Sequence, residues 1–221
     1  MEMKVELVSY TKSVNGPGQD EKSLIEQIAY VARVSNPANQ NNNETAERLV
    51  RYLIKNNHWS PLEMINVCLE IEVTRDIARQ ILRHRSFSFQ EFSQRYAIAD
   101  LGWECKSARL QDDKNRQNSI EVSDGNLSTE WHYQQEDVIR SAVAAYEWAI
   151  KNGIAKEQAR SVLPEGITLS RLYMNGTLRS WAHYIQLRTE KGTQKEHREV
   201  AFACAEKIAT VFPMIKEFVG E

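Results

Sequence analysis

Glycine-rich nucleotide motifs and paired cysteines are both missing from this 221-residue chain. Its nine glycines include no G-x-G-x-x-G and no Walker loop, so a dinucleotide would not be held by a Rossmann turn. Its three cysteines, Cys68, Cys105 and Cys204, form no C-x-x-C and have no paired histidine spacing. We therefore expect no metal site and no disulfide framework, and each cysteine to be a reduced, buried apolar residue.

Long apolar runs and a basic excess are also missing. No apolar stretch approaches membrane-spanning length, and the N-terminus lacks a signal-peptide pattern, so we expect a cytoplasmic protein. The formal net charge of −2 argues against general nucleic-acid binding, so any anion site must be local. A hydrophobic content of 42% and a charged content of 26% are typical of a soluble globular protein.

Apolar periodicity predicts both strands and helices. Strands are expected at 4–10, 65–73 and 168–177, the last with Asn175-Gly176 as its turn. Helices are expected at about 24–34, 44–57, 73–84, 129–152, 177–189 and 194–210, and Gly153 is placed to end the fourth of these. A turn is expected at 15–20, a loop at 36–43 and an exposed polar loop at 112–128. With no repeat and no internal boundary, the chain reads as a single domain, 1–221.

The densest binding chemistry lies in QILRHRSFSFQEFSQRY, residues 80–96. At about 100° per residue, the helix at 73–84 carries its polar side chains on the arc opposite its apolar ones. That polar arc comprises Arg79, Gln80, Arg83 and His84, and Arg85 falls just beyond the helix end. Clustered arginines are tolerated mainly around an anion, and their planar fork suits a phosphate or a nucleobase edge. The alternative interpretation is a solvated basic helix face.

Two further patterns extend this cluster. Glu91, Ser93 and Arg95 alternate, so in an extended segment they would project to one side, beside the helix end. In the helix at 177–189, Arg179 and His183 share an arc with Gln186, opposite the apolar arc. A lone histidine is more often a surface or core polar residue, but the neighbouring Arg179 leaves a binding role for His183 equally open. Arg188 falls near the opposite edge from Arg179, which predicts different contacts or different subunits for the two.

Arg83, His84 and Arg85, followed by Ser93 and Arg95, resemble the RHR and S-x-R signature of the flavin-dependent thymidylate synthases. The resemblance extends from about residue 32 to residue 198. It implies an α+β fold with a small, mostly antiparallel sheet packed with long helices, and a non-Rossmann FAD site shared across a homotetramer. The implied reaction is reductive methylation of dUMP to dTMP, with 5,10-methylenetetrahydrofolate as carbon donor and NADPH as reductant.

The resemblance also implies roles for individual residues. The FAD contacts it implies are Ser60, Arg83, His84, Arg85, Glu91, Arg179 and His183. The dUMP contacts it implies are Gln80, Arg83, Glu91, Ser93, Gln94, Arg95, Arg160 and Arg188. Two positions depart from the family pattern, since many members carry a glycine at position 94 and an asparagine is also found at position 183.

The resemblance also places Arg188 against the pyrimidine ring as the catalytic residue, where a guanidinium cannot act as a base but can stabilise an anionic ring. Ser93 is expected to contact phosphate or substrate rather than to act as a nucleophile. Two rival functions stay open at this point. One is a non-catalytic nucleotide-binding module, and the other is a cysteine-dependent thymidylate synthase, which needs a nucleophilic thiol.

Overall fold

A computed structural model describes residues 4–14 and 22–220 of the chain. Four strands form one antiparallel sheet in the order β1-β2-β6-β3. Their bounds are β1 Lys4–Tyr10, β2 Asn66–Thr74, β6 Leu169–Thr177 and β3 Ser88–Glu91. The predicted alternation in β2 is confirmed, since Val67, Leu69, Ile71 and Val73 are all buried. Together with the helices, this sheet gives the predicted α+β class.

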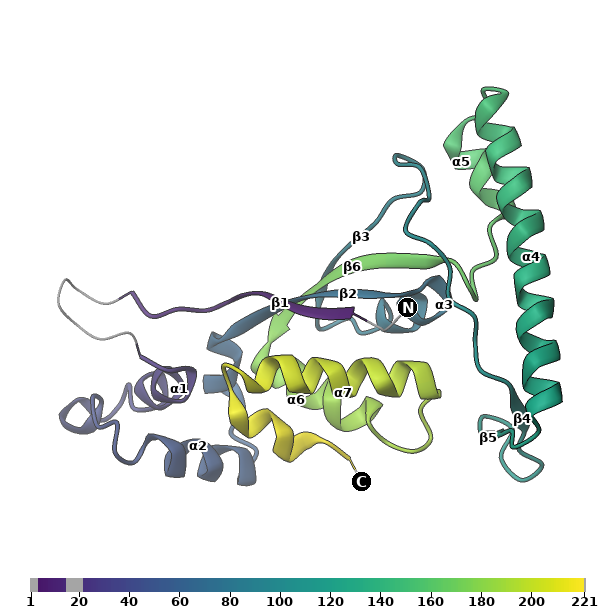
Figure 1. Cartoon of the computed structure of the whole chain (residues 1–221). Coiled ribbons are helices and arrows are strands. Elements are labelled where there is room, and N and C mark those ends of the chain that lie inside the picture. The colour runs from purple at the N-terminus through teal and green to yellow at the C-terminus, as the bar shows by residue number, and fades with distance from the viewer. Residues whose placement is uncertain (1–3, 15–21, 221) are drawn as a thin grey trace.

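Two long helices, α6 (Leu178–Arg188) and α7 (Lys195–Ala209), lie against one face of the sheet (Figure 1). The predicted apolar arc of α6 is buried there, with Trp181 and Ile185 both 0% exposed. The indole of Trp181 donates a hydrogen bond to the Val67 carbonyl, which ties the helix to β2. This packing sets the direction of α6, so its first and last turns reach two different parts of the molecule.

Two helices at one end of the sheet, α1 (Leu24–Ala32) and α2 (Ala46–Lys55), pack against each other, and η1 (Pro37–Asn39) lies between them in the chain. A capping box starts α1, because the Ser23 hydroxyl accepts from the Glu26 amide while the Glu26 carboxylate accepts from the Ser23 amide. The short helix η2 (Ser60–Met64) leads into β2, and η4 (Pro213–Phe218) packs on α7 near the C-terminus.

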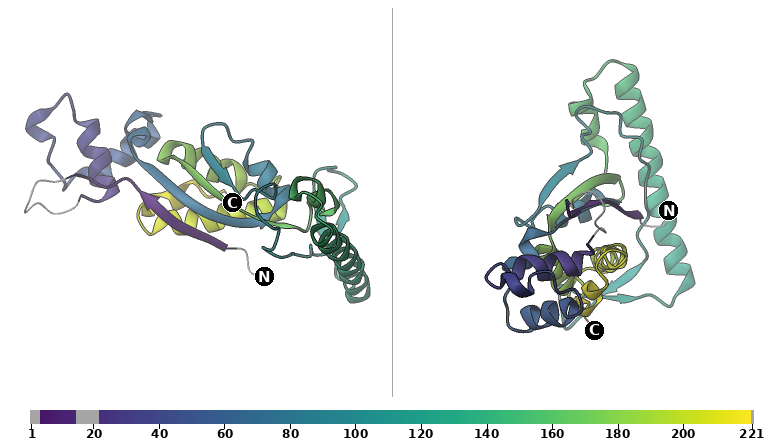
Figure 2. Two further views of the ribbon diagram at one scale, coloured as in Figure 1. Left: turned by 90° about the horizontal axis from the view of Figure 1, so that it is seen from above. Right: turned by 90° about the vertical axis from the view of Figure 1, so that its left-hand side faces the viewer.

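The longest helix, α4 (Gly125–Lys151), stands at the other side of the body (Figures 1 and 2). Its 27 residues span about 40 Å. It packs near its end on α5 (Lys156–Ala159) and η3 (Arg160–Val162), in a second apolar cluster that contains Tyr146 and Leu163. Gly153, at φ 76°, ends this region of helix as predicted.

Two predicted features of the fold are wrong. The helix predicted at 73–84 is shorter than expected. It is α3, which runs only from Arg75 to Ile81 and is followed by turns. Asn175-Gly176 is not a turn but part of β6. Gly176 is needed there because a Cβ would lie 2.4 Å from the Phe87 ring, so the glycine serves close packing inside a strand.

The predicted polar loop at 112–128 is also partly wrong, because it contains structure. A hairpin of β4 (Arg109–Gln111) and β5 (Ser119–Glu121) occupies its first half, and α4 begins at Gly125. The Asp112 carboxylate accepts from the amides of Lys114 and Asn115 and so builds the turn. The predicted turn at 15–20 lies outside the described residues. Within them, no helix has a segment long and apolar enough to cross a membrane.

Candidate active site

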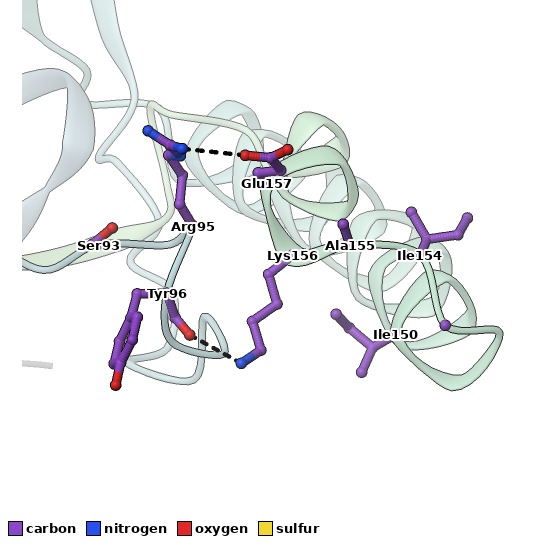
Figure 3. Close-up of a pocket in the computed structure, with 9 residues that line it drawn as sticks. Ser93, Arg95, Tyr96, Ile150, Ile154, Ala155, Lys156 and Glu157 are labelled. Atoms are coloured by element: carbon purple, nitrogen blue, oxygen red, sulfur yellow. Dashed lines mark hydrogen bonds and ion pairs between the residues drawn. The ribbon is translucent and has the colours of Figure 1, made fainter.

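A pocket of about 690 Å³ lies where the segment after β3 meets α5 (Figure 3). Ser93 and Arg95 line it, as do Lys156 and Glu157. The Arg95 guanidinium lies 3.4 Å from the Glu157 carboxylate, and the Arg160 Nε donates to the Glu157 carbonyl oxygen at 3.3 Å. Three predicted dUMP contacts therefore come together around one residue of α5.

The charge in this pocket is positive. The Glu157 carboxylate faces the Arg95 guanidinium, while the Lys156 ammonium donates to the Tyr96 carbonyl at 2.9 Å (Figure 3). The excess suits a phosphate, which accepts several charge-assisted hydrogen bonds. The prediction that Glu91, Ser93 and Arg95 lie in one extended segment is wrong, however. Ser93 begins a turn, in which its carbonyl accepts from the Tyr96 amide at 3.1 Å.

Glu91 and Gln94 do not line this pocket. Glu91 ends β3, and its Oε1 accepts from the Ser170 hydroxyl at 2.9 Å and from the Arg75 guanidinium at 3.4 Å. Gln94 is 4% exposed, and its Nε2 has no hydrogen-bond partner among the described residues. A buried amide donor without a partner is costly to stability, and this sets Gln94 apart from the other predicted contacts.

The arginines around α3 differ in their partners. Arg79 forms a bidentate ion pair with Glu165, at 2.7 and 2.5 Å. Arg83 and Arg85 lie in the turn after α3, exposed, and neither has a carboxylate partner within the described ranges. The two guanidiniums of the RHR motif thus keep their charge available, which fits the predicted binding of phosphates.

A second pocket, of about 430 Å³, lies along the first turns of α6. Arg179 and His183 line it from the predicted polar arc, together with Trp59 and Ser86. Arg179 forms an ion pair with Glu63 of η2. Ser60 is the exposed first residue of η2, directly after Trp59. The structure therefore brings three predicted FAD contacts to one end of α6, away from the first pocket.

The last turn of α6 carries a different arrangement. Arg188 Nε donates to His84 Nε2 at 2.9 Å, and Arg188 has no carboxylate partner in the described part of the chain. Burial, together with the charge of Arg188 and with His183, lowers the pKa of His84 to about 4. His84 is therefore neutral at pH 7 and accepts the hydrogen bond without cancelling the charge of Arg188.

Sequence reasoning missed several residues that complete these pockets. Glu157 and Lys156 come from a segment far along the chain from Ser93, and Glu63 comes from η2. Gln80 contacts Gln194 and His197 of the α7 region, which the helical arcs alone did not reveal. Because Gln80 and Arg188 carry several hydrogen-bonding groups, the sequence indicates that each needs partners, but it does not show which residues these are.

Comparisons with known proteins show the family of this chain. Residues 7–214 match the family model described as thymidylate synthase complementing protein. A probable flavin-dependent thymidylate synthase of Paramecium bursaria Chlorella virus 1 is 48% identical over 96% of this chain and 97% of its own. A flavin-dependent thymidylate synthase of Synechocystis sp. is 46% identical over 96% and 97% of the two chains.

The chain belongs to the flavin-dependent thymidylate synthase family. The predicted family, the thymidylate synthase activity and the dependence on a flavin are confirmed. A UMP/dUMP methylase from Streptomyces cacaoi, solved with 5-Br dUMP, has the same fold, with a TM-score of 0.82 over 98% of this chain and 94% of its own. At 24% identity that likeness concerns the fold alone.

The cysteines of this family member are poor candidates for a nucleophile. Burial raises the pKa of the Cys68, Cys105 and Cys204 thiols, and Cys204 is fully buried. A nucleophilic cysteine needs the opposite shift, toward the thiolate. Cys68 and Cys105 are only partly buried, so the prediction that all three are buried is wrong for these two.

Proposed function

We propose that residues 1–221 act as one domain that converts dUMP to dTMP, with FAD as hydride carrier, NADPH as reductant and 5,10-methylenetetrahydrofolate as carbon donor. Family membership supports the reaction class. The observation that carries the assignment of residues is the pairing of Arg188 with a neutral His84, because it leaves a guanidinium charge uncompensated beside the α3 end.

Arg188 is the residue we assign to the pyrimidine. Without a thiol adduct, C5 of uracil becomes nucleophilic when electron density rises in the ring, and negative charge at N3 would raise it. The guanidinium stabilises that charge without transferring a proton, since its pKa exceeds about 12. His84 fixes the direction of the guanidinium and, being uncharged, takes none of its attraction for the ring.

We assign the phosphate of dUMP to the pocket at α5. Ser93, Arg95 and Arg160 are the donors that would hold it, and Glu157 already orders the two guanidiniums. Gln80, Glu91 and Gln94 complete the proposed dUMP contacts, together with Arg83. The buried Nε2 of Gln94, which lacks a partner in the described part of the chain, supports its place in this set.

The residues present fit a flavin dinucleotide. Arg83 and Arg85 offer its phosphates two exposed guanidiniums that have no carboxylate partner among the described residues, and the pocket at Arg179 and His183 adds an aromatic wall at Trp59. Ser60, His84 and Glu91 are the remaining proposed contacts. When bound, the flavin supplies the redox chemistry, while these residues bind it, orient it and keep water away.

We further propose a homotetramer with shared active sites. The predicted dUMP and FAD contacts line separate pockets of one chain, so a neighbouring copy is needed to close them into one site. Apolar side chains on the outside of α4 offer a surface for such a copy: Trp131, Tyr133, Val138 and Trp148 are 43%, 58%, 49% and 62% exposed.

An absorption spectrum of the purified protein tests this function. We expect a yellow protein whose flavin band bleaches with NADPH, and dTMP formation when dUMP and methylenetetrahydrofolate are added. Dilution to folded monomers should release the FAD. A colourless protein that binds dUMP but makes no dTMP would indicate a non-catalytic nucleotide-binding module, and monomers that keep FAD tightly would contradict the shared site.

A further inference from the structure

A histidine outside the proposed site lies completely inside the protein. His197, in the first turn of α7, is 0% exposed. Its Nδ1 lies 3.1 Å from the Oε1 of Gln80, and its Nε2 has no partner among the described residues. A buried imidazole that uses only one nitrogen costs stability relative to an apolar side chain, so its single contact calls for an explanation.

The protonation state of this contact follows from its surroundings. Burial, with the nearby charge of Arg188 and with His84, lowers the pKa of His197 to about 3, so the ring is neutral at pH 7. A neutral imidazole carries one N–H, and the amide oxygen of Gln80 can only accept. The proton is therefore on Nδ1, and His197 donates to Gln80.

The contacts of Gln194, on the other side of Gln80 from His197, determine the orientation of the Gln80 amide. The Arg109 guanidinium lies 2.5 Å from Glu196, whose other oxygen accepts from Gln194 Nε2 at 2.9 Å. Burial alone would raise the pKa of Glu196, but hydrogen bonds from Arg109, the backbone and Gln194 outweigh burial and lower it. An ionised carboxylate only accepts, so the free atom of Gln194 that faces Gln80 is its oxygen.

The chain of donors and acceptors is thus fixed at both ends. Gln80 Nε2 donates to Gln194 Oε1 at 2.7 Å, and Gln80 Oε1 accepts from His197. Reversing the Gln80 amide would place oxygen against oxygen on one side and N–H against N–H on the other. One N–H and one lone pair of Gln80 remain, and they are presented in one defined order.

We propose that His197 is a positioning residue, which, with Gln194, locks the Gln80 amide in the orientation that contacts dUMP. This inference rests on the proposed role of Gln80 as a dUMP contact. It explains why a polar side chain occupies a core position where a phenylalanine of similar shape would avoid the unpartnered Nε2. The lock should raise the affinity for dUMP modestly, because a misoriented amide must turn before dUMP can bind.

Two substitutions at position 197 test the lock. His197→Phe keeps a ring and removes the donor, whereas His197→Asn keeps an N–H donor near the place of Nδ1. We expect His197→Phe to raise the KM for dUMP, and the dissociation constant from a dUMP titration of the flavin-loaded enzyme, by about tenfold. At saturating dUMP its kcat should fall less than about threefold, and its thermal midpoint should not drop in proportion. His197→Asn should recover most of the dUMP affinity.

Tyr184→Phe is the matched control. Tyr184 packs its ring 5.8 Å from His197, is fully buried, and its hydroxyl lacks a partner in the described chain. Removal of the Tyr184 hydroxyl should leave the KM for dUMP unchanged. Gln194→Ala removes the other side of the lock from an exposed position, so it reports on the lock even where position 197 tolerates no change; we expect a severalfold rise in KM.

The outcomes separate this inference from the proposed function. Gln80→Ala should weaken dUMP at least as much as His197→Phe. If it does and both His197→Phe and Gln194→Ala bind dUMP like the wild type, the lock is wrong and the site assignment stands. Unchanged KM in Gln80→Ala, or a wild-type enzyme that neither binds nor methylates dUMP, would overturn the assignment and the lock together. Equal losses in His197→Phe and His197→Asn would make the effect one of packing, contradicting the lock.

Discussion

The two ends of α6 hold an arginine in opposite ways. At its first turn, Arg179 is exposed and forms an ion pair with Glu63. At its last turn, Arg188 is half-buried and donates to the neutral ring of His84, with no carboxylate partner in the described residues. The same residue type on one helix is therefore compensated at one end and left with its full charge at the other.

This difference shows which arginine can respond to a developing anion. An exposed ion pair contributes about 0–1 kcal/mol and already satisfies its guanidinium. A partly buried, uncompensated guanidinium acts in a lower dielectric, where attraction for an anion is stronger. We therefore propose that the last turn of α6 serves transition-state stabilisation and that the first turn serves ground-state binding.

Removal of Arg188 should have the largest effect. We expect Arg188→Ala to retain FAD and to oxidise NADPH, yet to lose methyl transfer by on the order of 10²–10³ even at saturating dUMP. Arg188→Lys should rescue only part of this loss, because a point charge lacks the planar fork. The measurement is dTMP formation beside NADPH oxidation; full recovery at saturating dUMP would make Arg188 a binding contact instead.

Acid should lower the stability of the fold through His84, beside the last turn of α6, and through the nearby His197. His84 and His197 have folded-state pKa values of about 4 and 3, below the ordinary 6.5, so the unfolded chain takes up protons first. Their stabilising contribution is fully present above pH 6.5 and is lost as the pH falls toward 4 and 3. From His197 alone we expect a shift in the unfolding equilibrium of roughly 30-fold by pH 5, and His84 adds less than that because it is partly exposed.

Unfolding midpoints between pH 8 and pH 4.5 check this expectation. His197→Phe is the matched variant, because it removes one of the two depressed histidines and should flatten the acid limb. An acid limb with the same slope in the wild type and in His197→Phe would show that His197 does not titrate on unfolding in this way.

Removal of Arg179 should have a smaller effect at the other end of α6. Arg179→Ala breaks an exposed ion pair with Glu63, which should leave stability within about 1 kcal/mol of the wild type. FAD affinity should fall by about tenfold or less, while methyl transfer in the flavin-saturated enzyme stays near wild type. A loss of methyl transfer equal to that of Arg188→Ala would abolish the contrast between the two ends.

Removal of the thiols should have the smallest effect. Burial raises the pKa of all three cysteines, so none is set up as a thiolate. We expect the triple Cys→Ala protein to convert dUMP within about threefold of the wild-type rate, apart from some packing loss at buried Cys204. Complete inactivity of a folded, flavin-loaded triple variant would restore the thiol mechanism as a rival.

The contrast along α6 was visible in the sequence only in part. Helical spacing separated Arg179 and His183 from the buried arc and placed Arg188 at another edge, because that periodicity depends on one helix alone. The partners came from distant segments: Glu63 precedes β2, and His84 follows α3. Which arginine meets a carboxylate is decided by tertiary packing, and no local pattern encodes it.

The fold, like the site, was predicted correctly where it depends on local periodicity. Alternation fixed the buried face of β2, and α6 was bounded within one residue at each end, since both depend on local periodicity. Gly176 was misread because asparagine followed by glycine usually marks a turn, whereas here the glycine admits the Phe87 ring. The β5 strand has only three residues, with Ile120 as its one apolar side chain, which is too short for a readable alternation, so only the turn built by Asp112 reveals the hairpin.

The most direct test of the charge at Arg188 is the pH dependence of 5-Br dUMP binding. Bromine withdraws electrons and lowers the pKa of the ring N3–H, so the anionic ring becomes populated at mildly alkaline pH. Between pH 7.5 and pH 9 the phosphate is already ionised, and only the ring changes. We predict that the wild type binds this analogue more tightly as the pH rises and that Arg188→Ala loses that gain. An equal gain in both proteins would show that Arg188 does not stabilise the ring anion.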